Sequence, residues 1–186
     1  ARGESDFSGS PKFRTQNINV GAHKFNGIIL APEENFSFNQ FLGDVDASTG
    51  FVPELVIKNG TLVPEYGGGL CQVSTTLCRA AVKAGLPILE RRPHSLPVRY
   101  YNPQGFDATI YPGVVDLKFK NDTLAYILIQ SKIVGSKLYF EIYGTKDGRQ
   151  VTIDGPRQYD IQKNGALKAE LIRTVVYPDG QEKKEP

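Results

Sequence analysis

A run of three glycines, Gly67-Gly68-Gly69, followed directly by an amphipathic stretch, constrains the fold of this chain more than any other feature. Apolar residues recur with helical spacing from Leu70 onward, and Gly85 is a favourable residue just past a helix C-terminus. Because glycine reaches backbone conformations that are closed to other residues, the run predicts a tight turn that leads into a helix. A central helix is therefore expected over about residues 70–84, with Cys71 in its first turn.

Short extended segments separated by turn residues make up most of the remaining chain. They follow a short N-terminal helix, expected over residues 15–25 and ending near Asn26-Gly27. Asn59-Gly60 is the two-residue signal of a hairpin between residues 51–58 and 61–63. The other expected strands are 27–30, 36–38, 88–91, 98–101, 108–111, 115–119, 124–134, 137–144, 150–153, 158–161 and 170–177. The expected fold class is α+β, with a mostly antiparallel sheet packed around the central helix.

Three parts are expected along the 186 residues. Residues 1–12, rich in Gly, Ser and charge, predict a flexible N-terminal segment, and residues 13–146 form the main domain. Residues 147–186 predict a small β-rich extension that is truncated by the end of the sequence. Because the sequence begins at Ala1 and contains no methionine, we expect the natural start, with any signal or membrane anchor, to be missing from it.

The composition argues against bulk binding to polyanions. Lysine and arginine total 22 against 20 acidic residues, and a formal net charge of +2 gives no reason to expect a nucleic-acid partner. No apolar run approaches the roughly 20 residues that a membrane-spanning helix needs. We therefore expect contact with a membrane only through an anchor outside this sequence.

Cys71 and Cys78 are expected to be two free thiols. On one helix their separation places the Cα atoms roughly 10 Å apart, beyond the reach of a disulfide. A zinc site that adds His23 and His94 is formally possible, but its spacing matches no standard pattern. The sequence therefore predicts neither a metal nor a cofactor, and Cys78, inside the helix, is expected to pack as a small apolar residue.

Cys71 is the candidate nucleophile. The first turn of a helix offers unpaired backbone N–H groups at the positive end of the helix dipole, which favours a thiolate and can hold an oxyanion. His94, between two prolines, is the candidate general base and acid, and Asp107, at the start of an expected strand, is the candidate orienting group. In the alternative interpretation Cys71 is simply buried and His94 is a structural histidine.

The same region holds candidate ligand-binding residues. Backbone N–H groups near the turn would contact an oxyanion, hydroxyl groups on the Cys71 face of the helix would line a pocket, and arginines beside His94 would bind an anion. The alternatives are close backbone packing, hydroxyl bonds within the helix and a solvated charged face. The residues concerned are Gly68, Gly69, Gln72, Ser74, Thr75, Arg91 and Arg92.

Four ordered motifs resemble the VanW family, named from vancomycin-resistance gene clusters. They are Asn35-Phe36-Ser37-Phe38-Asn39, Tyr66-Gly67-Gly68-Gly69-Leu70-Cys71-Gln72-Val73-Ser74-Thr75-Thr76-Leu77, Glu90-Arg91-Arg92-Pro93-His94-Ser95-Leu96-Pro97-Val98 and Gly105-Phe106-Asp107-Ala108-Thr109. Cys78 departs from the family pattern, which usually has an aromatic residue there. The resemblance covers roughly residues 13–144, so that 13–146 would be a VanW-like domain. It implies an extracytoplasmic cell-envelope protein at the surface of a bacterium, mostly Gram-positive, commonly with an N-terminal membrane anchor.

Together these observations support three hypotheses, of which the first two are the main ones. In the first, the domain acts on cell-wall (peptidoglycan) peptide by thiol-dependent acyl transfer, either amide hydrolysis or transpeptidation. In the second, it is a non-catalytic peptidoglycan-binding or scaffolding module. A surface domain for protein partners, built on the β extension, is the third.

Overall fold

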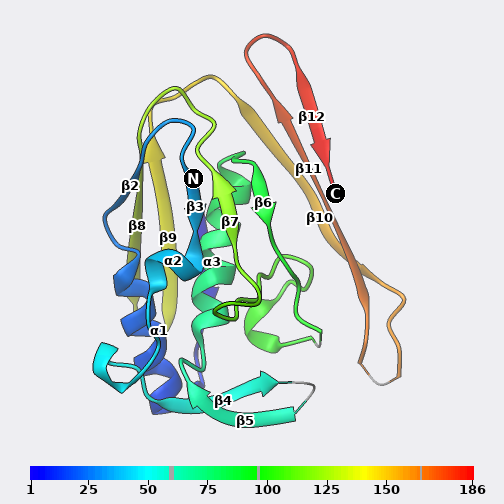
Figure 1. The fold of residues 1–186 in the computed structure, drawn as a ribbon. Helices are drawn as coiled ribbons and strands as arrows, with labels where there is room; N and C mark the ends of the chain where they lie inside the picture. Colours follow the sequence, from blue (N-terminus) through cyan, green and yellow to red (C-terminus); the bar gives the residue numbers. More distant parts are fainter. Residues whose placement is uncertain (59–60, 96, 164) are drawn as a thin grey trace.

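The computed structural model describes residues 1–58, 61–95, 97–163 and 165–186, without the side chains of residues 57–58, and places α3 (Leu70–Lys83) in the middle of the molecule (Figure 1). The fold class is α+β with antiparallel sheets, as expected. In chain order the other elements are β1 (Arg2–Asp6), α1 (Lys12–Lys24), β2 (Ile28–Leu30), β3 (Asn35–Ser37), α2 (Phe38–Leu42), η1 (Ala47–Thr49), β4 (Pro53–Lys58), β5 (Thr61–Tyr66), β6 (Ile88–Glu90), η2 (Arg99–Tyr101), β7 (Lys118–Lys120), β8 (Ile127–Val134), β9 (Lys137–Gly144), β10 (Gln150–Tyr159), β11 (Lys168–Val176) and β12 (Glu182–Glu185).

The largest sheet has the strand order β1-β9-β8-β2 and lies against α3. Its β8–β9 hairpin turns at Gly135-Ser136, as the sequence predicts. The expectation of a flexible segment over residues 1–12 is wrong, because β1 pairs with β9 throughout its length. Alternate β1 residues face the helix, so that a Cβ placed on Gly3 would lie 2.1 Å from the Thr76 carbonyl oxygen. That close approach to α3 keeps the N-terminus in the sheet.

Aromatic side chains join the elements that cover α3. The rings of Phe36 in β3 and Phe119 in β7 stack with centroids 4.4 Å apart. Phe25, which follows α1, stacks on Phe38 at 4.2 Å and meets Phe140 of β9 edge-on at 6.3 Å. All five side chains are fully buried. The sheet β3-β7-β6 is therefore part of the same hydrophobic core as the four-stranded sheet.

Several sequence expectations differ from the structure around this core. Residues 98–101 were expected to form a strand but contain the 3₁₀ helix η2. Residues 108–111 form no strand, because α3 hydroxyl groups bond the backbone of Ala108 and the Thr109 N–H donates to the Arg92 carbonyl. The extended segment expected at 36–38 ends at Ser37, whose side chain caps α2 by accepting a hydrogen bond from the Gln40 N–H. The Asn59-Gly60 turn lies outside the described residues, although β4 and β5 pair as expected.

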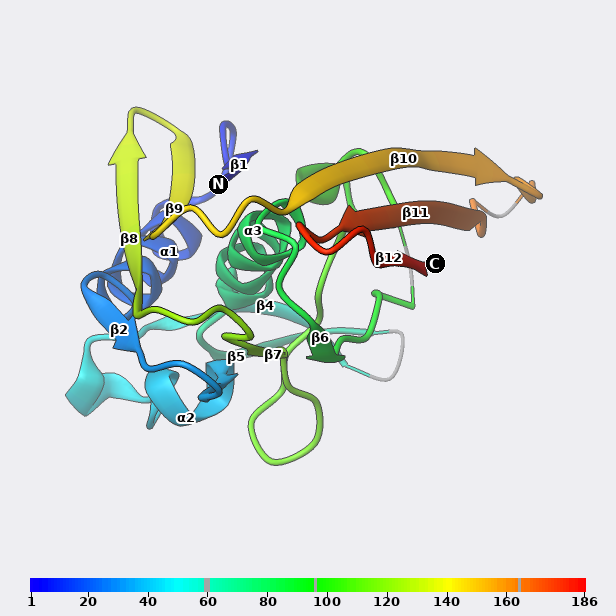
Figure 2. The ribbon, with the colours of Figure 1, turned by 90° about the horizontal axis from the view of Figure 1, so that it is seen from above.

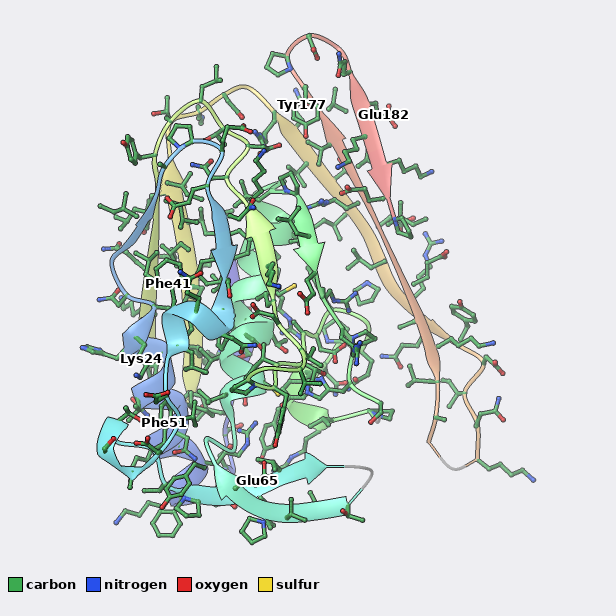
Figure 3. The ribbon with its side chains drawn as sticks, viewed as in Figure 1. Lys24, Phe41, Phe51, Glu65, Tyr177 and Glu182 are labelled. Carbon is green, nitrogen blue, oxygen red and sulfur yellow. The ribbon has the colours of Figure 1, made fainter. Side chains whose placement is uncertain are left out.

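The C-terminal residues form a separate sheet, β10-β11-β12, that extends to one side of the domain (Figure 2). Tyr177 and Glu182 mark one tip of this sheet (Figure 3). Near the end of α3 it contacts the core closely, since a Cβ on Gly85 would lie 2.7 Å from a Val151 methyl carbon. Arg173 of β11 also donates a hydrogen bond to the Leu86 carbonyl at 2.7 Å. The extension is thus held against the main domain by buried contacts.

No helix within the described residues is long and apolar enough to cross a membrane.

Candidate functional site

The glycine run turns the chain tightly into α3. Gly67 and Gly69 have φ values of +84° and +112°, which residues other than glycine rarely adopt. Gly68 is packed so closely that a Cβ there would lie 2.9 Å from the Cβ of Glu54. The buried Asn17 side chain donates to the Gly68 carbonyl at 3.1 Å and so joins α1 to the turn. Gly68 and Gly69, expected to contact a ligand, are therefore also required by the packing of the turn.

Cys71 lies in the first turn of α3, as predicted. Its side chain is partly buried, and its Sγ lies 3.6 Å from the Ile110 carbonyl oxygen. The Gln72 N–H donates to the Gly69 carbonyl at 2.9 Å, whereas among the described residues the Cys71 N–H has no backbone acceptor. The Gln72 amide is therefore used by the turn, whereas the Cys71 N–H is one of the open N–H groups at the start of the helix.

The structure brings the side chains of His94 and Asp107 together. The Nδ1 of His94 lies 2.5 Å from Oδ2 of Asp107, and the His94 backbone N–H donates to the same oxygen at 2.8 Å. The His94 ring stacks on Tyr101 with centroids 4.3 Å apart, and only 10% of its side chain is exposed. The ring is thus held by its edge and its face, which leaves Nε2 for the Cys71 side chain.

The ionisation of His94 reflects this arrangement. Burial favours the neutral ring, but hydrogen bonds with Asp107 and Cys71, and the charges of these two groups, outweigh it and raise the pKa of His94 to about 9. Burial acts to raise the pKa of the Asp107 carboxyl. The hydrogen bonds from His94 and the positive charges of His94 and Arg91 outweigh burial, so the pKa of Asp107 is lowered. At neutral pH the pair is therefore an imidazolium and a carboxylate.

The polar face of α3 positions the segment that carries Asp107. Ser74 donates to the Ala108 carbonyl at 2.6 Å, and Thr75 accepts from the Ala108 N–H at 3.0 Å. Both hydroxyl side chains are fully buried. Gln72 is buried on another face of the helix, where it donates to the Ser5 hydroxyl at 3.1 Å. The structure therefore directs these three candidate ligand-binding side chains to internal partners.

The two candidate arginines lie in different surroundings. Arg91 donates to the backbone carbonyls of Asp107 at 2.7 Å and Gly105 at 2.9 Å, and its guanidinium lies 3.8 Å from the Asp107 carboxylate. Its role in the structure is to support Asp107. Arg92 is exposed, and its carbonyl accepts from the Thr109 N–H at 2.8 Å. Both arginines are exposed, and Arg91 also lines the groove beside His94.

The cysteines behave as two free thiols. Cys78 is fully buried in the core, and burial raises the pKa of its thiol to about 11. His23 lies exposed on α1. Among the residues that the structure describes, no three His, Cys, Asp or Glu side chains are grouped closely enough to hold a metal ion. Cys78 therefore packs as an apolar residue, as predicted.

Two residues beside Cys71 were missed by sequence reasoning. Tyr101 is buried, and burial together with the charge of Cys71 raises the pKa of its hydroxyl. Arg14 of α1 is also buried, and its guanidinium acts against this rise in the pKa of Tyr101. A tyrosine close to the proline-bracketed histidine is a weak signal in the sequence, and Arg14, on a distant helix, has none.

A groove of about 530 Å³ runs beside His94. His94 and Asp107 line one wall, while residues of β11, among them Ala169 and Leu171, line the other. The two walls are in tight contact, since a Cβ on Gly105 would lie 2.5 Å from the Cβ of Ala169. The C-terminal extension is therefore one side of the groove that leads to the candidate site.

On the opposite flank, the β4–β5 hairpin lies near the segment that follows Ile110. Glu65 of β5, labelled in Figure 3, accepts a hydrogen bond from the Tyr111 hydroxyl at 3.4 Å. Leu55, Leu62 and Val114 expose more than half of their side-chain surface in this region. An exposed apolar surface therefore adjoins the segment whose Ile110 carbonyl meets Cys71.

The geometry defines an α+β domain with a cysteine–histidine–aspartate cluster at the start of its central helix. The chain belongs to the VanW family: the family model described as VanW like protein matches residues 13–143. It is 37% identical over 139 residues to the uncharacterized protein YoaR of Bacillus subtilis, covering 75% of this chain and 46% of that protein. It is 30% identical over 158 residues to vancomycin B-type resistance protein VanW of Enterococcus faecalis, covering 81% of this chain and 57% of that protein.

The chain thus spans about half the length of the curated relatives it matches. None of the solved structures matches it.

Proposed function

We propose that this chain is an extracytoplasmic bacterial cell-envelope domain that acts on peptidoglycan peptide by thiol-dependent acyl transfer. Cys71 is the nucleophile, His94 the general acid and base, and Asp107 the group that orients His94. The observation that carries the proposal is the 2.5 Å contact between His94 Nδ1 and Asp107, in a ring whose pKa the neighbouring Cys71 also raises. The family and the name of the Enterococcus relative, which refers to vancomycin resistance, support a place in the cell envelope.

The reaction follows from the proton positions at the site. The His94 imidazolium, which a pKa of about 9 favours, already carries on Nε2 the proton that the Cys71 thiol has given up, and Sγ attacks the carbonyl carbon of an amide as a thiolate. The new C–S bond forms, the C–N bond breaks, and His94 returns the proton to the leaving amine. Water, or the amine of a second peptide, then attacks the thioester, gives a proton to His94 and releases the Cys71 thiolate.

In this proposal the backbone at the start of α3 stabilises the oxyanion. The Cys71 N–H has no backbone acceptor among the described residues, so it can donate to the oxyanion that forms as Sγ attacks. Asp107 keeps Nδ1 protonated and Nε2 directed away from the carboxylate, while Arg91 fixes the Asp107 backbone. Each of these groups is in place before a substrate binds.

The first test separates the two cysteines by their reactivity. Cys71 is expected to be alkylated by iodoacetamide well below pH 8, and its rate should fall at least about tenfold in His94→Ala. His23→Ala, at an exposed histidine on α1, is the matched control and should leave the rate unchanged. Cys78, buried and with a raised pKa, is the slow internal reference. Equal, sluggish labelling of both cysteines would contradict an activated thiol.

The second test asks for turnover. Purified peptidoglycan is incubated with the wild-type protein and with Cys71→Ala, and the soluble and wall-bound products are compared by mass spectrometry. Hydrolysis would shorten stem peptides, transpeptidation would change cross-links, and both changes should disappear in Cys71→Ala. No change with the wild-type protein would contradict the proposed reaction.

A peptidoglycan-binding module is the alternative function, and one observation favours it. The groove of about 530 Å³ is lined by His94 and Asp107, but the described residues that line it do not include Cys71. A ligand bound there would contact the pair without reaching the thiol. If Cys71→Ala still sediments with wall material while the wild type changes nothing, the binding function is the correct one.

A further inference from the structure

Arg14 on α1 is a buried arginine without an acidic partner. The residue is 8% exposed, and its Nη1 donates to the Ser10 hydroxyl at 2.8 Å. Its guanidinium lies 3.9 Å above the Tyr100 ring and is close enough to the Tyr101 hydroxyl to act against the rise in the pKa of that group. No carboxylate forms an ion pair with Arg14 in the part of the chain that the structure describes. A buried guanidinium is therefore left without a neutralising charge.

The other buried arginine side chains show how unusual this is. Arg79 donates to four backbone carbonyls, at distances of 2.7 to 3.3 Å. Arg173 is bound by the Leu86 carbonyl and the Glu185 carboxylate. Arg149 is bound by the Asp122 and Asp147 carboxylates and the Gly85 carbonyl. Each of these three is paired with a carboxylate or donates to several carbonyls, and among the described residues Arg14 does neither.

Arg14 lies next to the candidate site. A Cβ on Gly69 would lie 3.1 Å from Arg14 Cγ, so the arginine stem packs against the turn two residues before Cys71. The Tyr101 ring, whose hydroxyl meets Arg14, stacks on His94 at 4.3 Å. Tyr101 therefore joins the guanidinium to the catalytic pair, and an anion bound at Arg14 would lie close to Cys71.

We propose that Arg14 binds a carboxylate of the substrate beside Cys71. The planar guanidinium matches a carboxylate with two parallel hydrogen bonds, and an incoming anion would supply the charge that the protein lacks there. The substrate is then a peptide whose free carboxylate lies within a few bonds of the reacting carbonyl, so the site works near a chain end and not on an internal amide. This inference rests on the proposed function, because it takes Cys71 as the reacting atom.

The test compares two alkylating reagents that differ in charge. Iodoacetate carries a carboxylate next to the reacting carbon, and iodoacetamide is its neutral counterpart. The measured quantity is the rate with iodoacetate divided by the rate with iodoacetamide at Cys71, relative to the same ratio for glutathione. This relative ratio is expected to be about tenfold higher in the wild type than in Arg14→Gln. Arg14→Lys keeps the positive charge but loses the two parallel N–H donors of the guanidinium, so its relative ratio should lie between those of the wild type and Arg14→Gln. Arg2→Gln, at an exposed arginine of β1 outside the site, is the control and should behave as wild type.

A second measurement needs no reactive thiol and no variant at Arg14. In the Cys71→Ala protein, the Arg14 Nε–Hε NMR signal should shift when N-acetylalanine is added and should not shift with the neutral N-acetylalaninamide. An unchanged rate ratio in Arg14→Gln with a normal iodoacetamide rate, or an NMR signal that ignores both compounds, overturns the carboxylate site. If the NMR signal shifts while Cys71 stays as unreactive as Cys78, the carboxylate site stands and the proposed acyl transfer fails.

Discussion

Replacing Asp107 by asparagine is expected to remove most of the pH dependence that His94 gives to the stability of the fold. The pKa of His94 rises from its ordinary 6.5 to about 9 in the folded protein. A group whose pKa is raised by folding stabilises the folded state fully below its unfolded pKa, and this stabilisation is lost as the pH rises through the folded value. The wild-type protein should therefore hold the contribution of His94 below pH 6.5 and lose it by about pH 9.

The magnitude follows from the size of that change. Each tenfold change in proton affinity corresponds to about 1.4 kcal/mol, so a pKa raised from 6.5 to about 9 contributes about 3 kcal/mol at low pH. Solvent screening is weak because only 10% of the His94 side chain is exposed. Asp107 provides one of the two hydrogen bonds that raise the pKa, and Cys71 provides the other. The Asp107→Asn protein is therefore expected to lose about 2 kcal/mol of the stabilisation that protonated His94 gives the folded state at low pH.

The assay is urea unfolding of both proteins near pH 6 and near pH 9. Cys78 also weakens the fold at alkaline pH, because burial raises the pKa of its thiol to about 11 and the unfolded chain ionises first. Burial, the largest cause, is common to both proteins, so most of this effect cancels in the difference between them. The Asp107 charge also raises the Cys78 pKa, and its loss in Asp107→Asn lowers the alkaline destabilisation, in the same direction as the change at His94. If the wild type and Asp107→Asn lose the same free energy of unfolding between about pH 6 and about pH 9, Asp107 does not control the ionisation of His94.

Two further predictions concern the parts that position the pair. Gly105→Ala places a Cβ 2.5 Å from the Cβ of Ala169 at a φ of +94° and should cost more than about 2 kcal/mol of stability in urea unfolding, whereas Gly113→Ala, at +77° with open space around it, should cost about 1 kcal/mol. A smaller difference between these two variants would mean that Ala169 of β11 can move away from residue 105 at little cost in free energy. Ser74→Ala removes the 2.6 Å bond to the Ala108 carbonyl and should lower the stability by about 1 to 3 kcal/mol in the same assay, and an unchanged midpoint would show that this carbonyl finds another donor.

Features set by neighbouring residues were predicted best. The helix expected over residues 70–84 is α3 over Leu70–Lys83, because both its apolar spacing and its glycine turn are local signals. The β8–β9 hairpin across Gly135-Ser136 was found for the same reason. The family was recognised from ordered motifs, and the family model confirms it over residues 13–143.

Features that depend on distant partners were missed. The strand β1 is polar and glycine-containing, and only its pairing with β9, more than 130 residues away, makes it a strand. Residues 108–111 have strand-like composition, but Ser74 and Thr75 on α3 take the backbone bonds of Ala108. A single sequence carries no signal for a hydrogen bond between a helix side chain and a distant backbone group.

Residue chemistry and chain order were determined by the sequence alone. It placed a cysteine in the first turn of a glycine-led helix and named His94 and Asp107 as possible partners, because helix termini and proline-bracketed loops are local features. Tertiary structure alone decided which side chains meet. It pairs His94 with Asp107, turns Ser74, Thr75 and Gln72 inward, and buries Arg14 with no carboxylate partner among the described residues. Burial and charge pairing are properties of packed elements, and they arise only when the helices and sheets come together.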